Sequence, residues 1–129
     1  MIDFEKAQSA FKEYLKQYDL ADGSVNLKVV HTYGVVEKSE YIARELGLDE
    51  DNVLLAKLIA ILHDIGRFEQ VKLTKDFDDS KGFEHANYGV KVLFEDGLIR
   101  NFIEDFKYDE VIGKAIYNHN KYAVEDGLR

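Results

Sequence analysis

The residues best suited to chemistry in this chain are its four histidines: His31, His63, His85 and His119. Each is predicted to lie in a helix, or at the end of one, three or four residues from apolar neighbours. His31 follows Leu27 by four residues, and His63 follows Ile59 by four. Because side chains three and four residues apart share one face of a helix, we expect all four imidazoles to point inward.

Two explanations for inward histidines stay open at this point. A single histidine on an apolar helix face is most often a core residue whose ring is satisfied by one or two hydrogen bonds. Four such residues, with no histidine predicted on the surface, favour a shared explanation. Histidine is the commonest metal ligand in proteins, so one metal centre would satisfy several rings together.

Asp64 directly follows His63, at the end of the apolar run in "AKLIAILHDIGRFEQ". A carboxylate is unfavourable at a helix C-terminus, so we expect no capping role for it. It is then either a solvated loop acid or a metal ligand whose two oxygens can bridge two cations. A set of nitrogen and oxygen ligands without cysteine suits Mn²⁺, Fe²⁺, Co²⁺, Ni²⁺, Zn²⁺ or Mg²⁺ and does not choose among them.

The elements that position these residues are predicted to be helices. Proline is absent and strand-like alternation is scarce, which favours an all-α fold. The helices are expected at 2–20, 25–46, 50–65, 84–95, 98–106 and 109–118. The third is apolar on nearly every side from Val53 to Leu62, so it belongs at the centre of the fold. The polar segment 66–83 is predicted to be a long loop, of a kind that is usually functional or mobile.

Several boundary and face assignments follow from individual residues. Gly47 is predicted to end the second helix and Asp49 to cap the third, while Gly23 and Ser24 are predicted to end the first helix and begin the second. The buried stripe of the second helix is expected to hold Leu27, Val30, Gly34, Val35, Ile42 and Leu46, with His31 on the same face.

Composition limits the classes of function. A chain of 129 residues is one domain by size, here 1–129. Its net charge of −8 argues against binding a long nucleic acid, which needs clustered cations. No apolar run approaches the roughly 20 residues that span a membrane, and the acidic N-terminus is unlike a signal peptide. The absence of cysteine is consistent with a cytoplasmic protein.

The ordered set of His31, His63-Asp64, His85 and His119 resembles the HD-domain superfamily of metal-dependent phosphohydrolases. "ILHDIGRFE" is similar to the family signature, and "HANYGVKVLFEDG" and "AIYNHNKY" resemble the later histidine segments of a bacterial branch. The resemblance extends over residues 27–121. It implies an HD-like bundle of about five to six helices in which His31, His63 and Asp64 bind a catalytic divalent metal. It also implies that His85 and His119 hold a second metal or contact the substrate phosphate.

The resemblance implies hydrolysis of a phosphomonoester or phosphodiester, on a nucleotide or a small phosphate ester, by metal-activated water. Asp64 would orient or deprotonate the water as well as bind the metal. Arg67 would offer a planar fork to phosphate oxygens. The alternative for Arg67 is a surface ion pair with Glu69. Three lysines of the predicted loop are expected to be solvated rather than phosphate ligands: Lys72, Lys75 and Lys81.

The chain departs from the family pattern at its C-terminal end. The family closes with a further aspartate, on a helix after the segment that matches His119, and Asp126 is a poor substitute for it. We therefore expect a domain that lacks a closing helix and is incomplete at its C-terminus, with apolar stripes left uncovered that favour a homodimer. The missing ligand also favours the alternative function, a non-catalytic nucleotide- or partner-binding module. A helical interaction domain with satisfied core histidines is the third reading.

Overall fold

The computed structural model describes residues 2–74 and 84–126, with side chains through Asn118 in the last helix. Within these residues the chain forms helices and turns and no strand, so the predicted all-α class is confirmed. The α-helices are α1 Phe4–Leu15, α2 Gly23–Glu45, α3 Glu50–Leu62, α4 Ile65–Thr74, α5 His85–Val90, α6 Ile99–Phe102 and α7 Asp109–Asp126. The π-helix η2 Lys91–Glu95 continues α5, and the 3₁₀-helix η3 Phe106–Tyr108 precedes α7.

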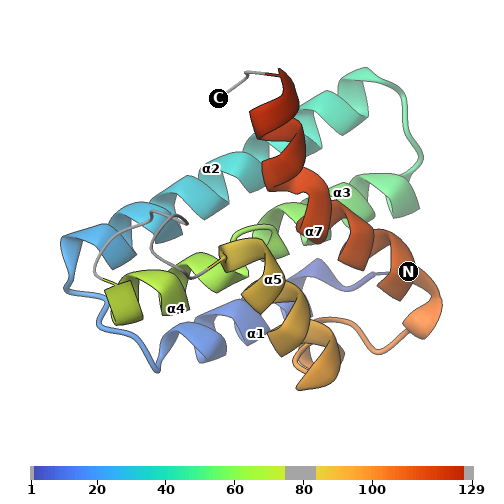
Figure 1. Ribbon diagram of the computed structural model, residues 1–129. Helices are drawn as coiled ribbons and strands as arrows, with labels where there is room; N and C mark the ends of the chain where they lie inside the picture. The colour runs from blue at the N-terminus through green and yellow to red at the C-terminus, as the bar shows by residue number, and fades with distance from the viewer. Residues whose placement is uncertain (1, 75–83, 127–129) are drawn as a thin grey trace.

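The helix α3 lies at the centre of the bundle, as predicted. It packs against α1, α2 and α7, and Figure 1 shows the long helix α2 running beside it. Leu58, Ile61 and Leu62 are at most 1% exposed. Each such side chain buries enough apolar surface to stabilise the fold by roughly 1.5–3 kcal/mol, which gives the end of α3 a fixed position.

Aspartates begin several of the helices. The Asp49 carboxylate accepts a hydrogen bond from the backbone N–H of Asn52 at 2.9 Å, which confirms Asp49 as the N-cap of α3. Gly47 has a φ of 75° and directly follows Leu46, the C-cap of α2, so it ends that helix as predicted. The predicted N-cap of α2, Ser24, was wrong. The Asp22 carboxylate accepts hydrogen bonds from the backbone N–H groups of Ser24 and Val25, so Asp22 is the N-cap and Gly23 lies inside the helix.

The segment after the His-Asp pair is a helix where the sequence predicted a loop. The third predicted helix ends early, at Leu62, and α4 then begins at Ile65. Ile65, Phe68 and Val71 recur every three residues and are buried. The Phe68 ring packs at an angle against Phe11, with 5.9 Å between the ring centroids. This burial against α1 stabilises a helix whose other faces are polar. The remainder of the predicted loop, 75–83, lies outside the described residues.

The predicted inward face of α2 was wrong. Most of the expected stripe is exposed, at 65% for Leu27, 61% for Val30, 56% for Ile42 and 71% for Leu46. The buried residues of α2 are instead Val25, Thr32, Val36 and Ala43. Apolar residues lie on more than one face of this helix, so their spacing alone does not identify the face that meets α3.

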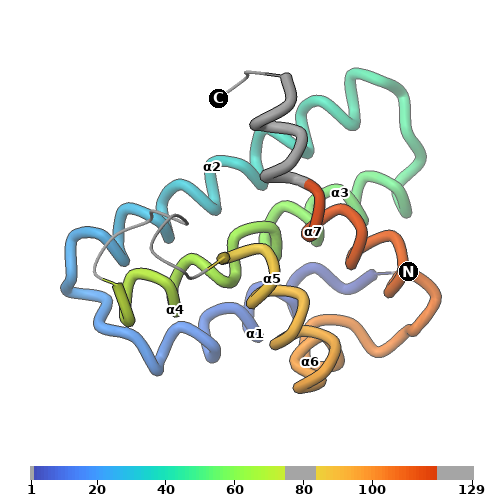
Figure 2. The backbone as a smooth tube through the Cα atoms, viewed as in Figure 1, coloured from blue at the N-terminus to red at the C-terminus, as the bar shows by residue number. Residues whose placement is uncertain are grey.

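The later helices differ from prediction mainly in their bounds. The predicted helix at 84–95 divides into α5 and η2, and the one at 98–106 is reduced to the four residues of α6. The last helix continues to Asp126 rather than ending at 118. Figure 2 traces the chain through α6 and round to α7. No described helix has both the length and the apolar character needed to cross a membrane.

Candidate metal centre

His63 and Asp64 form the bend between the two central helices. His63 is the C-cap of α3, and α4 begins at the residue after Asp64. The expectation that Asp64 lies only at a helix C-terminus was therefore wrong. Asp64 is only 6% exposed, so the bend places a carboxylate inside the protein, not in a solvated loop.

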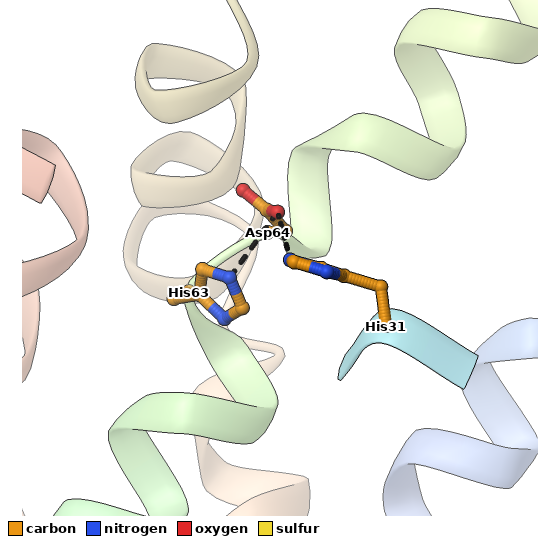
Figure 3. Close-up of side chains that lie close together, drawn as sticks. All are labelled: His31, His63 and Asp64. Atoms are coloured by element: carbon orange, nitrogen blue, oxygen red, sulfur yellow. Dashed lines mark ion pairs between the residues drawn. The ribbon is translucent and has the colours of Figure 1, made fainter. Parts of the chain in front are cut away.

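One oxygen of Asp64 faces two imidazoles, as Figure 3 shows. His63 Nε2 lies 3.2 Å from Asp64 Oδ2, and His31 Nε2 lies 3.9 Å from the same oxygen. One ligand atom from each residue can be chosen so that all three lie within 4.8 Å of one another. Among the side chains that the structure describes, this is the group that can hold a metal ion. Three predicted metal ligands are thus brought together.

The other oxygen of Asp64 faces a third imidazole. His85, the first residue of α5, is fully buried, and its Nε2 lies 3.3 Å from Asp64 Oδ1. The inward orientation predicted for His85 is therefore correct. Imidazoles therefore approach both oxygens of the Asp64 carboxylate.

The ring of His63 is oriented by a backbone carbonyl. His63 Nδ1 lies within hydrogen-bonding distance of the Ala60 carbonyl oxygen. A carbonyl can only accept, so Nδ1 donates to it, and Nε2 is the nitrogen that faces Asp64 Oδ2. Metal-binding histidines characteristically donate their second N–H to such a carbonyl, so the geometry fits a metal ligand.

His31 is where the inward prediction was wrong. Its side chain is 49% exposed, because α2 turns Thr32, not His31, toward the core. His31 lies on the flank of the buried face and reaches Asp64 from the solvent side. Partial desolvation, followed by the positive charge of Lys28, lowers the pKa of His31 below its usual value. A neutral imidazole at neutral pH is the form that binds metals.

Lys28 is a site residue that the sequence reasoning missed. Its Nζ lies 3.2 Å from Asp64 Oδ2, the oxygen that also faces His63 and His31. The Lys28 side chain is 15% exposed. The available signal was its position three residues before His31, which places both side chains on one face of α2.

Arg67, predicted to bind phosphate, lies beside the same carboxylate. Its Nε is 4.0 Å from Asp64 Oδ1, and its Nη1 donates to Gln70 Oε1 at 2.7 Å. Glu69, the alternative partner, accepts from the Tyr18 hydroxyl at 2.7 Å, and no ion pair joins it to Arg67 among the described side chains. With 16% exposure Arg67 is not a surface residue. Its contact with phosphate stays a prediction.

The remaining candidates are not placed at the centre. The exposed Lys72 has its Nζ 5.8 Å from the centre of the Tyr18 ring, while Lys75 and Lys81 lie outside the described residues. His119 and Asp126 belong to α7, but their side chains are outside the described part of the chain. Their predicted roles are therefore untested.

Two glycines let α4 and α5 approach closely enough to bring His85 to Asp64. A Cβ atom at Gly66 would overlap the backbone carbonyl oxygen of His85. A Cβ at Gly89 would lie 3.2 Å from Ile65 Cγ2, which is a tight contact. The glycine after the His-Asp-Ile sequence therefore permits helix packing that a side chain would prevent.

Comparison with known proteins agrees with this geometry. The family model of the HD domain matches residues 29–127, a range that begins just before His31 and includes His63, Asp64, His85 and His119. No curated protein and no solved structure gives a significant match. The family match extends over most of the 129 residues. The chain belongs to the HD-domain family.

Proposed function

We propose that this protein is a metal-dependent phosphohydrolase that cleaves a phosphomonoester or phosphodiester. The observation that carries the proposal is the approach of His31 and His63 to one oxygen of a buried aspartate. The His63 ring, oriented by a backbone carbonyl, adds to it. Membership of the HD-domain family supports the same class of reaction.

The residues proposed to hold a divalent metal are His31, His63 and Asp64. His85 and His119 are proposed to bind a second metal or the substrate phosphate. Manganese, iron, cobalt, nickel, zinc and magnesium all suit nitrogen and oxygen ligands. A divalent metal at such a site supplies Lewis acidity, lowering the pKa of water and neutralising phosphoryl oxygens.

In this reaction the side chains of the protein are proposed to orient the water, to bind the phosphate and to limit the access of solvent. Asp64 is proposed to orient the attacking water and to accept its proton as well as to bind the metal. Arg67 is proposed to bind the phosphate, because a guanidinium matches phosphate oxygens with two parallel donors. Asp64 is only 6% exposed, and this burial strengthens the electrostatic interactions that it makes.

We propose a nucleotide or a small phosphate ester as substrate and the cytoplasm as the place of action. A net charge of −8 disfavours long nucleic acids, whose phosphates need clustered cations. We also propose a homodimer, since α2 exposes Leu27, Val30 and Tyr41 by more than half of their surface. Apolar exposure of this kind promotes association between copies.

The test combines metal analysis with hydrolysis of a chromogenic phosphate monoester and a panel of nucleotides, on this chain and on Asp64→Asn. We expect metal-dependent turnover by the native chain. Asn keeps the shape of Asp64 but removes its charge, so metal affinity and turnover should fall by about 10²-fold or more. Asp96→Asn, at an exposed ion pair with Lys91, is the control and should behave like the native chain. Turnover that persists in Asp64→Asn contradicts the proposal.

The alternative is a non-catalytic module that binds a nucleotide or a protein partner. One observation favours it: among the described side chains, no second carboxylate joins His31, His63 and Asp64. This function predicts that a nucleotide raises the melting temperature without being hydrolysed, and that the effect survives Asp64→Ala. Metal-dependent turnover in the native chain that is lost with Asp64 separates the two functions.

A further inference from the structure

Lys28 makes the closest ion pair with the proposed metal ligand Asp64 that any lysine or arginine makes among the described residues. Its Nζ lies 3.2 Å from Asp64 Oδ2, whereas Arg67 Nε lies 4.0 Å from Oδ1. The lysine side chain is 15% exposed and the aspartate side chain 8%. Partial burial weakens the screening of this pair by solvent, so its contribution is larger than that of a surface salt bridge.

Lys28 and the two imidazoles converge on the same atom. Asp64 Oδ2 is 3.2 Å from Lys28 Nζ, 3.2 Å from His63 Nε2 and 3.9 Å from His31 Nε2. The Lys28 ammonium therefore donates a hydrogen bond to the oxygen that faces both imidazoles. A divalent cation held by that oxygen would lie about 2 Å from it. Repulsion between the two positive charges at such separation is strong in a partly buried site.

The geometry points to Lys28 as the resident counter-ion of Asp64, which the metal displaces from Oδ2. This inference rests on the metal site of the proposed function but not on the reaction. Without metal, the ammonium forms an ion pair with the buried carboxylate. With metal, the four-carbon stem swings the ammonium off the oxygen. Lys28 is a positioning residue whose ion pair the protein exchanges for the metal.

The exchange of the Lys28 ammonium for the metal has consequences for both protein stability and metal affinity. Removing Lys28 destabilises the metal-free protein, which loses the ion pair, but changes the metal-bound protein little, because the pair is already broken there. By linkage, the variant without the ammonium must bind metal more tightly by the same factor. If Lys28 were only structural and stayed on Asp64 throughout, it would stabilise both states equally and leave metal affinity unchanged.

The test uses Lys28→Met, which keeps the length and apolar stem of the side chain. Mn²⁺ affinity is measured by calorimetric titration of the full chain, and thermal unfolding is recorded with and without Mn²⁺. We expect Lys28→Met to melt lower than the native chain without Mn²⁺ and to melt at a similar temperature at saturating Mn²⁺. Its affinity should be about tenfold higher, within the usual range of coupling between two sites.

The matched control is Lys57→Met. Lys57 is similarly buried, at 17% exposure, and pairs with Glu40 at 3.5 Å away from the centre. It should lower the melting temperature equally with and without Mn²⁺ and leave affinity unchanged. Lys28→Arg retains the charge, so its affinity should stay near the native value and gives a second comparison where Lys28→Met folds poorly.

Three results overturn the inference. They are an unchanged or weaker Mn²⁺ affinity in Lys28→Met, an equal loss of stability with and without Mn²⁺, and no Mn²⁺ binding by either chain. Failure of the proposed function is distinguishable. Lys28→Met can bind Mn²⁺ more tightly while the native chain hydrolyses no phosphate ester. That result supports the exchange of Lys28 for the metal and contradicts the proposed phosphohydrolase activity.

Discussion

The two sides of Asp64 are built from the same residue types but are held in opposite ways. On the α4–α5 side, His85 is fully buried and the helices are in backbone contact at Gly66. On the α2 side, His31 is half exposed and Lys28 reaches the carboxylate through a flexible stem. Helix packing fixes the position of His85 on the α4–α5 side, whereas an ion pair holds Lys28 on the α2 side. We call the α4–α5 side of this candidate metal site the rigid wall and the α2 side the adjustable wall.

The strongest way to break the rigid wall is Gly66→Ala. The new methyl group would overlap the carbonyl oxygen of His85, which belongs to the backbone and cannot rotate away. The helices α4 and α5 must separate, so we expect a loss of about 3 kcal/mol or more of unfolding free energy, at the upper end for overpacking. The His85 ring should also move from Asp64. Chemical denaturation measures the first effect, and metal affinity the second.

The matched variant on the adjustable side is Gly34→Ala. Nothing lies within 4 Å of a Cβ at Gly34, in the middle of α2. Alanine should therefore leave stability unchanged or raise it by up to about 1 kcal/mol, since glycine is the poorer helix former. If Gly66→Ala and Gly34→Ala lower the free energy of unfolding equally, the proposed difference between the rigid and the adjustable wall is wrong.

The two histidines sharpen the comparison. His85→Gln places a differently shaped amide in a fully buried position and should cost about 1–3 kcal/mol of unfolding free energy. His31→Gln, at a half-exposed position, should cost less than about 0.5 kcal/mol but weaken metal binding by at least about tenfold. Denaturation and metal titration of both variants separate the effects. A large stability loss in His31→Gln runs against this division.

A further prediction concerns stability at alkaline pH and the tyrosines of the segment that packs against α4. The hydroxyls of Tyr14 and Tyr18 lie 2.9 Å apart, and Tyr18 donates to Glu69 at 2.7 Å. Burial raises the pKa of Tyr14 to about 12 from its usual 10. Because the unfolded chain ionises first, this stability is fully present below pH 10 and is lost as pH rises through 12. At pH 11 Tyr14 alone should account for a loss of about 1.4 kcal/mol, and Tyr18, whose pKa burial also raises, adds to it.

Unfolding followed from pH 9 to 11.5 measures this loss, and Tyr14→Phe should flatten its slope. The control on the adjustable side is Tyr41→Phe, since Tyr41 is 67% exposed on α2. Tyr41→Phe should follow the native curve. A native stability that stays constant to pH 11.5 contradicts the burial argument.

Much of the site could be predicted because its signals are local. The apolar run before His63 predicts a central helix, and α3 is one. The Asp49 cap and the Gly47 stop were also correct, since each depends on backbone conformation within a few residues. By contrast, α4 was missed. Its helix depends on burying Phe68 against α1, a contact between residues far apart in sequence.

The sequence by itself determined that the chain is helical, that α3 is buried and that His63 and Asp64 come at its end. Those properties depend on composition and on periodicity within one helix. Only the tertiary structure decided which face of α2 meets α3, and so that His31 is half exposed and Lys28 reaches Asp64. A helix with apolar residues on several faces gains from burying any of them, and the choice is made by the surface of its neighbour.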